Sequence, residues 1–252
     1  MTSLDPMAAP LSCEGVHARY GRRRVLHGVD LAVARGSTVG LIGLNGAGKT
    51  TLIKTILALR PAEAGTIRLF GRDGHRPDAR RDLAFLPEQY APAPGLRGWT
   101  VLDLACRAFG LRLDRDEAAA RAVALDLDPE VLSRRVATLS KGMGQKLGLL
   151  ATLLVERPLI LLDEPMSGLD PRARHALKRA LEARRAAGGA TLFSSHILSD
   201  VAALCDRVVA IHAGRVIAEG PPQALIDAAG TGDLESAFLA AVTAAEADAP
   251  AA

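Results

Sequence analysis

The stretch that decides the fold runs from Thr38 to Leu57 and reads TVGLIGLNGAGKTTLIKTIL. Its first five residues, 38–42, form a short apolar run bounded by glycines, which is typical of a buried strand. Gly43 to Thr50 then match the pattern G-x-x-x-x-G-K-[ST], and residues 49–59 predict a helix. In such a loop successive backbone N–H groups point at phosphate oxygens, and the helix adds its positive N-terminal end. The stretch therefore predicts a nucleotide-phosphate site.

The chemistry of the loop assigns roles to its residues. Lys49 is expected to reach the β- and γ-phosphates, and the Thr50 hydroxyl to ligate Mg²⁺. The residues predicted to hold the nucleotide are Gly43, Leu44, Asn45, Gly46, Ala47, Gly48, Lys49, Thr50 and Thr51. No N-K-x-D loop, which would usually accompany guanine specificity, is present.

A second apolar run, residues 159–162 (LILL), ends directly in Asp163 and Glu164. Two acids at the end of a buried strand are costly unless they face a cation, and parallel sheets bind ligands at the carboxyl ends of their strands. We expect Asp163 to hold Mg²⁺, directly or through water. Glu164 is expected to polarise the water that attacks the γ-phosphate. The glycine loop and the acid pair together are shared by kinases, GTPases and many ATPases.

The secondary structure suggested by the pattern changes along the chain. Strands are expected at residues 16–20, 25–34, 65–70, 82–86, 191–194, 208–211 and 216–218. Between them, helices are expected at residues 101–109 after a Thr100 cap, 114–125 with Asp114 and Glu117 as a capping box, and 141–155 after a Ser140 cap. Further helices are expected from the Asp170-Pro171 cap to 187 and at 197–205, with a helical tail and an Ala-rich, frayed end after Gly220. This order predicts an α/β domain with an all-helical insert.

Composition excludes several classes of protein. The chain has 252 residues, 49% hydrophobic and 23% charged, without an apolar run of about 18 residues or a secretory leader, so we expect a soluble protein. The net charge is +3 and aromatic residues make up 3%, which argues against nucleic-acid binding. The three cysteines, Cys13, Cys106 and Cys205, are widely spaced and suggest neither disulfides nor zinc.

Three further motifs carry a resemblance to a known family. Leu139 to Met143 (LSKGM) resemble the L-S-G-G-Q signature of ABC transporter ATPases, although Lys141 and Met143 depart from it. Ser167 to Asp170 (SGLD) are similar to the D-loop of that family, and Ser194-Ser195-His196 to its switch histidine. From about Leu11 to Gly220, the chain resembles the ATP-binding subunit of an ABC transporter.

The resemblance implies roles for these residues. It implies that Ser140, Lys141, Gly142 and Met143 face the γ-phosphate of ATP held by a partner subunit. It implies that Ser167, Gly168, Leu169 and Asp170 contact the opposite subunit. His196 would reach the γ-phosphate and Tyr20 would stack on adenine. Leu86 to Gln89 (LPEQ) resemble the Q-loop, where either Glu88 or Gln89 would contact Mg²⁺ or the attacking water.

The resemblance also implies a fold, a division of the chain and partners. The fold class is α/β, a P-loop NTPase (RecA-like) core with an N-terminal antiparallel β subdomain and an inserted all-helical subdomain. The expected division is a flexible N-terminus at 1–10, nucleotide-binding core at 11–88 and 158–220, a helical subdomain at 89–157 and a short helical tail at 221–252. The implied partners are an integral membrane permease and a second ATP-binding subunit, either a second copy or a close paralogue.

The resulting hypothesis is a cytoplasmic subunit, held at the inner face of the membrane by the permease, that energises an exporter. The L-P-E-Q and L-S-K-G-M forms resemble those of exporter-type members. The alternative is a soluble, non-transport ABC ATPase of translation or DNA repair. A small-molecule kinase would leave the signature and the D-loop unexplained.

Overall fold

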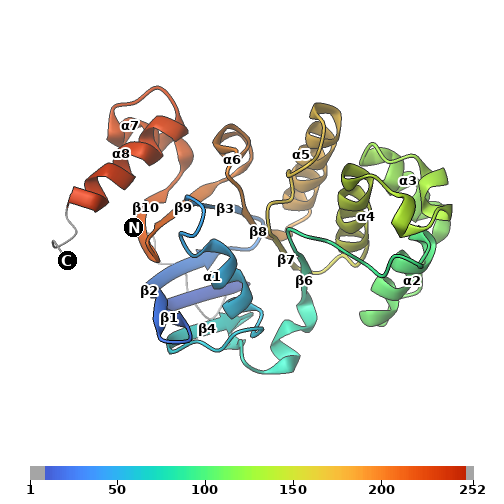
Figure 1. Cartoon of the computed structure of the whole chain (residues 1–252), viewed down its shortest axis with the longest axis horizontal. Helices are drawn as coiled ribbons and strands as arrows, with labels where there is room; N and C mark the ends of the chain where they lie inside the picture. The colour runs from blue at the N-terminus through green and yellow to red at the C-terminus, as the bar shows by residue number, and fades with distance from the viewer. Residues whose placement is uncertain (1–8, 248–252) are drawn as a thin grey trace.

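A six-stranded sheet forms the centre of the computed structural model, which describes residues 9–247 (Figure 1). Its strand order is β10-β9-β3-β8-β7-β6, and every neighbouring pair is parallel except the β9–β10 hairpin. The strands are β3 (Thr38–Ile42), β6 (Leu83–Leu86), β7 (Leu159–Leu162), β8 (Ala190–Ser194), β9 (Arg207–His212) and β10 (Arg215–Gly220). The apolar runs before the glycine loop and before the acid pair are thus strands of one sheet, as predicted.

Both faces of the centre of this sheet are covered, which explains why strands such as β7 are apolar at every position. In β7, Leu159 and Leu161 belong to one hydrophobic core, whereas Ile160 and Leu162 belong to the other. All four leucine and isoleucine side chains are fully buried. Successive residues of a strand point to opposite faces, so the run LILL supplies both cores at once.

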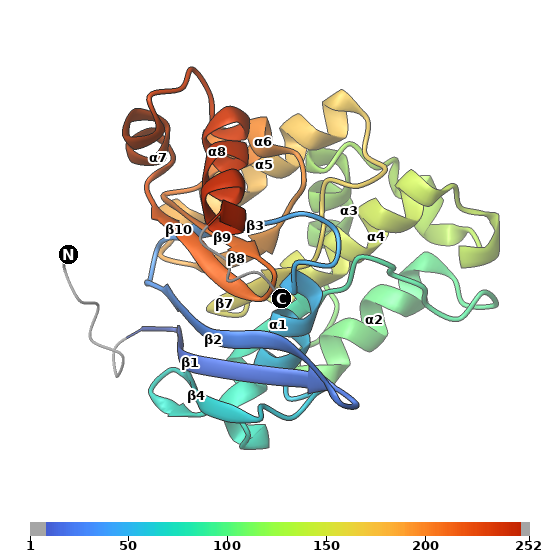
Figure 2. The same cartoon turned by 60° about the vertical axis from the view of Figure 1, so that its left-hand side comes forward.

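A second, antiparallel sheet has the order β2-β1-β4-β5 and lies beside the first (Figure 2). Its strands are β1 (Leu11–Tyr20), β2 (Arg23–Val33), β4 (Ala64–Leu69) and β5 (Arg72–Asp73). Helix α1 (Lys49–Ile56) buries Leu52, Ile53 and Ile56 in the core that both sheets share. Strand β1 begins five residues earlier than residue 16, because Leu11, Ser12 and Cys13 pair with both β2 and β4.

A helical subdomain follows β6 and lies to one side of the strands (Figure 1), as expected. Its elements are α2 (Gly98–Ala108), α3 (Arg115–Ala124), the 3₁₀ turns η2 (Pro129–Ser133) and η3 (Val136–Thr138), and α4 (Lys141–Leu154). Ser140 caps α4 as predicted, since its Oγ accepts a hydrogen bond of 3.2 Å from the N–H of Met143. Asp114 likewise caps α3.

Two expectations in this region are wrong. Thr100 does not cap α2, which already begins at Gly98; the Gly98 N–H donates to the Arg134 carbonyl at 3.2 Å, so a tertiary contact sets the start of the helix. Glu117 does not complete a capping box at α3, because its carboxylate pairs with Arg121 at 2.6 Å instead.

The remaining helices are α5 (Pro171–Ala186), α6 (Leu198–Leu204), α7 (Pro222–Ala229) and α8 (Leu234–Ala247), with a 3₁₀ turn η1 (Pro77–Asp82) before β6. Helix α1 ends at Ile56, before the expected residue 59, because Ala58 has a left-handed backbone with φ of 53°. None of the helices between residues 9 and 247 has the length and apolar character needed to span a membrane. The expected frayed end and most of the expected flexible start at 1–10 fall on residues 248–252 and 1–8, which lie outside the described part. For residues 9 and 10 the expectation is wrong, because both are buried and the Pro10 carbonyl accepts a hydrogen bond from the Phe70 N–H at 3.1 Å.

Candidate functional site

The glycine loop lies at the carboxyl edge of the large sheet, between β3 and α1. Two of its glycines are required by geometry. A Cβ on Gly43 would lie 2.4 Å from the carbonyl oxygen of Ile211, and Gly48, the N-cap of α1, has φ of +114°. Side chains rarely adopt that conformation, so the spacing of glycines in the motif is dictated by the backbone path. The path leaves the N-terminal end of α1 facing the loop, which favours an anion there.

Lys49 is held across this loop rather than extended into solvent. Its side chain is buried, and Nζ donates to the carbonyl oxygens of Gly43 at 2.6 Å and of Leu44 at 3.4 Å. An ammonium fixed by main-chain acceptors contributes a positive charge at a defined place, which suits the binding of phosphate.

A cavity of about 480 Å³ adjoins the loop. It brings together four parts of the chain that are remote in sequence: the loop and the segments that follow β6, β7 and β8. The lining residues are Leu44, Asn45, Gly46, Ala47, Gly48, Lys49, Thr50, Thr51, Glu88, Glu164 and His196. The phosphate-binding residues predicted from sequence therefore share one cavity with Glu164 and His196. Gly43 contacts it only through the carbonyl that holds Lys49.

The acid pair is joined to His196 through a chain of hydrogen bonds. Ser194 Oγ donates to Asp163 Oδ1 at 2.6 Å and accepts from the Glu164 N–H at 2.9 Å. Glu164 Oε2 lies 2.7 Å from His196 Nδ1. Asp163 and Ser194 are buried at the ends of neighbouring strands, whereas His196 is largely exposed. The four residues thus connect the buried sheet edge to the cavity.

Glu164 has an unusual backbone. Its φ of 50° lies in the left-handed region that non-glycine residues rarely adopt. Such strain persists only where the surroundings determine it, and it is concentrated at functional sites. Here the hydrogen bond from its N–H to Ser194 and the contact of its carboxylate with His196 fix both ends of the residue.

Some residues predicted for the site lie elsewhere. Gln89 does not line the cavity whereas its neighbour Glu88 does, so the geometry distinguishes the two Q-loop candidates. Tyr20 is also outside the lining; it is 44% exposed at the β1–β2 turn, and the Arg60 guanidinium lies 3.3 Å from its ring centroid. Asp163 is 3% exposed and reaches the cavity only through its neighbours.

The signature and D-loop residues pack against one another, away from the cavity. A Cβ on Gly142 would lie 3.1 Å from the carbonyl oxygen of Gly168, and the stem of Lys141 lies over Gly168. Ser167 to Asp170 connect β7 to α5, where Asp170 Oδ1 accepts from the Ala173 N–H at 2.9 Å. That bond, followed by the charge of Lys146, lowers the pKa of Asp170 below its ordinary value.

The oxygen donors at the sheet edge fit Mg²⁺. Mg²⁺ in nucleotide sites is held by one or two protein oxygens together with substrate phosphates. The Thr50 hydroxyl in the cavity lining and the buried Asp163 carboxylate are ligands of this type. Within residues 9–247 no group of three or more His, Cys, Asp or Glu side chains could hold a metal alone, so a cation here would depend on the nucleotide.

Two residues of this region were not predicted as part of the site. Ser194 is named from the sequence only as part of the Ser-Ser-His run. Its role follows from the strand register: Leu162 pairs with Phe193, so the next residues of the two strands, Asp163 and Ser194, lie side by side. Lys146 bonds the Asp126 carbonyl at 2.6 Å and its carboxylate at 2.8 Å, and lies 3.5 Å from Asp170. A lysine on a helix gives no sequence signal that distinguishes it from a solvated one.

A glycine loop between a parallel strand and a helix, with acids at the end of another parallel strand of the same sheet, defines a P-loop NTPase. The family model described as ABC transporter matches residues 26–167. A Nod factor export ATP-binding protein of Burkholderia orbicola is 36% identical over 225 residues, covering 87% of this chain and 73% of the relative. A daunorubicin resistance ATP-binding protein of Streptomyces coeruleorubidus is 36% identical over 213 residues, covering 83% and 67%.

Among solved structures, one described as the ATP-binding subunit of an ABC transporter superposes with a TM-score of 0.86 at 34% identity, covering 92% of this chain and 98% of that one. This chain belongs to the ABC transporter family, as an ATP-binding and ATP-hydrolysing subunit.

Proposed function

We propose that this chain hydrolyses ATP to energise an exporter, with Glu164 as the general base. The observation that carries the proposal is the cavity in which Glu164, bonded to His196 at 2.7 Å, faces the phosphate loop. A carboxylate fixed by a hydrogen bond beside a phosphate site is placed to accept a proton from the attacking water. Glu88 adds a second acid to the same wall and is the Q-loop residue in this proposal.

In this proposal each residue of the site has one task. The loop N–H groups and Lys49 bind the β- and γ-phosphates, and His196 contacts the γ-phosphate. Thr50 and Asp163 hold Mg²⁺, which neutralises charge on the phosphates when it is bound. Ser194 orients Asp163 and Glu164 together, because its hydroxyl bonds to both residues.

The proposed working unit is a pair of subunits. Ser140 to Met143 lie outside the cavity lining, at the start of α4, where backbone N–H groups favour an anion. In the pair these residues complete the ATP site of the partner, and Ser167 to Asp170 lie at the contact between subunits. Two copies of this chain would form an isologous interface. A close paralogue could take the second place.

The proposed division of labour follows the chain. Residues 11–88 and 158–220 bind nucleotide, residues 89–157 carry the movement to an integral membrane permease, and residues 221–252 form a tail. Tyr20 stacks on adenine in this scheme. Export as the direction of transport is supported by the relatives, whose names refer to Nod factor export and daunorubicin resistance. The permease holds the subunit at the inner face of the cytoplasmic membrane.

The test compares Glu164→Gln with Lys49→Ala. The first is expected to lower ATP hydrolysis by about 10²- to 10⁴-fold while ATP still binds, because only the positioned base is lost. The second should weaken ATP binding itself. Glu182→Gln, at an exposed position of α5, is the matched control and should hydrolyse ATP at the wild-type rate. Wild-type hydrolysis by Glu164→Gln would refute the assignment.

Purification from membranes tests the partner. Recovery of the chain with a polytopic membrane protein is the expected result. Recovery with ribosomes or DNA in its place would favour a non-transport ATPase and overturn the export proposal.

A further inference from the structure

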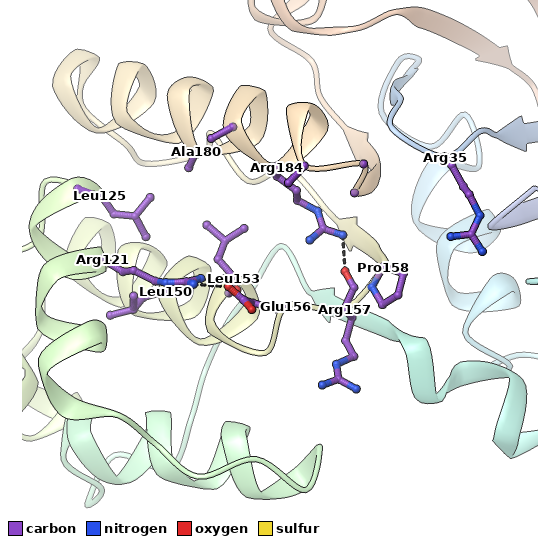
Figure 3. A pocket seen from close by; sticks show the side chains of 15 residues that line it. Arg35, Arg121, Leu125, Leu150, Leu153, Glu156, Arg157, Pro158, Ala180 and Arg184 are labelled. Carbon is purple, nitrogen blue, oxygen red and sulfur yellow. Dashed lines mark hydrogen bonds and ion pairs between the residues drawn. The ribbon is translucent and has the colours of Figure 1, made fainter.

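A second cavity of the described chain lies apart from the nucleotide site. It measures about 640 Å³ and lies between the helical subdomain and the core, at the edge of the sheet opposite the glycine loop (Figure 3). Helices α3 and α4 form one side, and α5 with the segment before β7 forms the other. Its volume is in the range of sites that enclose a small organic ligand.

One side of this cavity is apolar. Leu125, Leu150 and Leu153 of the helical subdomain line it, and Ala180 lies opposite on α5 (Figure 3). Leu125 and Leu150 belong to the buried core, and Leu153 packs partly exposed against it. A ligand that covered this wall would gain the free energy of removing apolar surface from water.

The lining of the cavity also carries an excess of positive charge. Arg35, Arg121, Arg157 and Arg184 line the cavity, but Glu156 is the single acid in its lining. Glu156 is already paired with Arg121, which also binds Glu117. The other three arginines form no ion pair with any residue between 9 and 247, so three guanidinium groups share one cavity without a carboxylate of their own.

Arg184 is the most constrained of these cations. It reaches from α5 toward the carbonyl oxygen of Arg157 and also bonds the Ala190 carbonyl at 3.3 Å, but its Nε is buried without a partner (Figure 3). Burial lowers the pKa of Arg184, since the charged form is desolvated. A desolvated cation without a counterion is stabilised by an anion that enters beside it.

We propose that this cavity binds a small amphipathic anion, a carboxylate with an aliphatic tail. The head would lie against Arg35 and Arg184, and the tail against the leucines of α3 and α4. Charge complementarity and the apolar wall select for this class over neutral or cationic amphiphiles. Because the ligand would contact both the helical subdomain and the core, its binding would join the two parts at a place remote from ATP.

Isothermal titration calorimetry of the full chain with monomeric decanoate tests the proposal. Decanoate is expected to bind, and decanol and decyltrimethylammonium to bind about tenfold more weakly or not at all, since they lack the charge-assisted hydrogen bonds. Arg35→Gln and Arg184→Gln should each weaken decanoate binding by about tenfold. Arg35 is exposed, so its variant keeps the test valid if Arg184→Gln fails to fold.

Steric controls separate this cavity from other anion sites. Ala183→Trp, at an exposed lining position of α5, should abolish binding by filling the mouth of the cavity. Ala186→Trp and Arg185→Gln make the same changes on the same helix outside the lining and should bind decanoate as the wild type does. Absence of decanoate binding, equal binding of decanol, or wild-type binding by Ala183→Trp would each overturn the proposal.

Discussion

Replacement of Ser194 by alanine is expected to damage both the stability of the fold and catalysis. The Ser194 side chain is fully buried, and its hydroxyl bonds to Asp163 Oδ1 at 2.6 Å and to the Glu164 N–H at 2.9 Å. Alanine has no hydroxyl group, so neither hydrogen bond can form. A buried carboxylate oxygen and a backbone N–H would then both lose a partner.

The magnitude follows from those two groups. An unmade hydrogen bond costs roughly 1–3 kcal/mol for a neutral buried donor and about 1.5–3 kcal/mol at a charged acceptor. Solvent that enters from the cavity side lowers the combined cost of the two lost hydrogen bonds. We therefore expect Ser194→Ala to lower the free energy of unfolding by about 3 kcal/mol. For a domain of this size that corresponds to a fall in Tm of roughly 6–12 °C. Glu164 would also lose the bond that supports its strained backbone, so kcat should fall more than KM rises.

The matched control is Thr191→Val on the same strand. Thr191 is buried and its hydroxyl has no hydrogen-bond partner, so a methyl group in its place should leave Tm unchanged or raise it. Differential scanning calorimetry and steady-state ATPase assays on both variants decide the matter. If Ser194→Ala melted within about 2 °C of the wild type, or if Thr191→Val lost as much stability as Ser194→Ala, the argument from unsatisfied groups would be refuted.

Three further outcomes are expected. Lys146→Met should lose about 2 kcal/mol in urea unfolding, since Asp126 would keep only the exposed Arg172 as a cationic partner, whereas Lys146→Arg should retain most of that stability. Native protein should resist thiol labelling by Ellman's reagent at pH 8 until it is denatured, because burial raises the pKa of all three thiols, those of Cys13, Cys106 and Cys205. The pKa of Asp170 is lowered in the folded protein, so its contribution to stability is present above about pH 4 and is lost as the pH falls further; Asp170→Asn should remove that part of the acid dependence of Tm.

The sheet was predictable because its strands have a physical signature. A strand covered on both faces is mostly apolar, and LILL is apolar throughout whereas TVGLI is apolar apart from Thr38. Helix starts were predictable where a side chain of the helix itself caps them, as at Ser140 and Asp170. They were not predictable at Gly98, where a hydrogen bond to Arg134 across the helical subdomain decides the start.

In the candidate site, too, some residues could be predicted from the sequence and others could not. Residues 44–51 could be assigned to the cavity from local sequence, since the backbone path of the loop depends on its own glycines. The choice between Glu88 and Gln89 could not be made, because adjacent residues at a strand end differ only in the direction of their side chains. To predict the role of Ser194, one must know which strand lies beside β7. The order of strands in the sequence does not give their order in the sheet.

The same reasoning supports the proposal that this chain holds only part of an ATP site. Its catalytic side is internally fixed: Lys49 is bonded to the loop, and Glu164 is bonded at its N–H and at its carboxylate. The start of α4 is equally fixed, since Ser140 caps the helix and Gly142 meets Gly168, yet it lies outside the cavity. Each half is preorganised by contacts within its own part of the chain, so neither needs the other to fold. For the phosphate-binding loop and the start of α4 to contact the same nucleotide, two rigid surfaces must therefore move together. In the proposed pair that movement is the association of two subunits, with ATP binding the closed form more tightly than the open one.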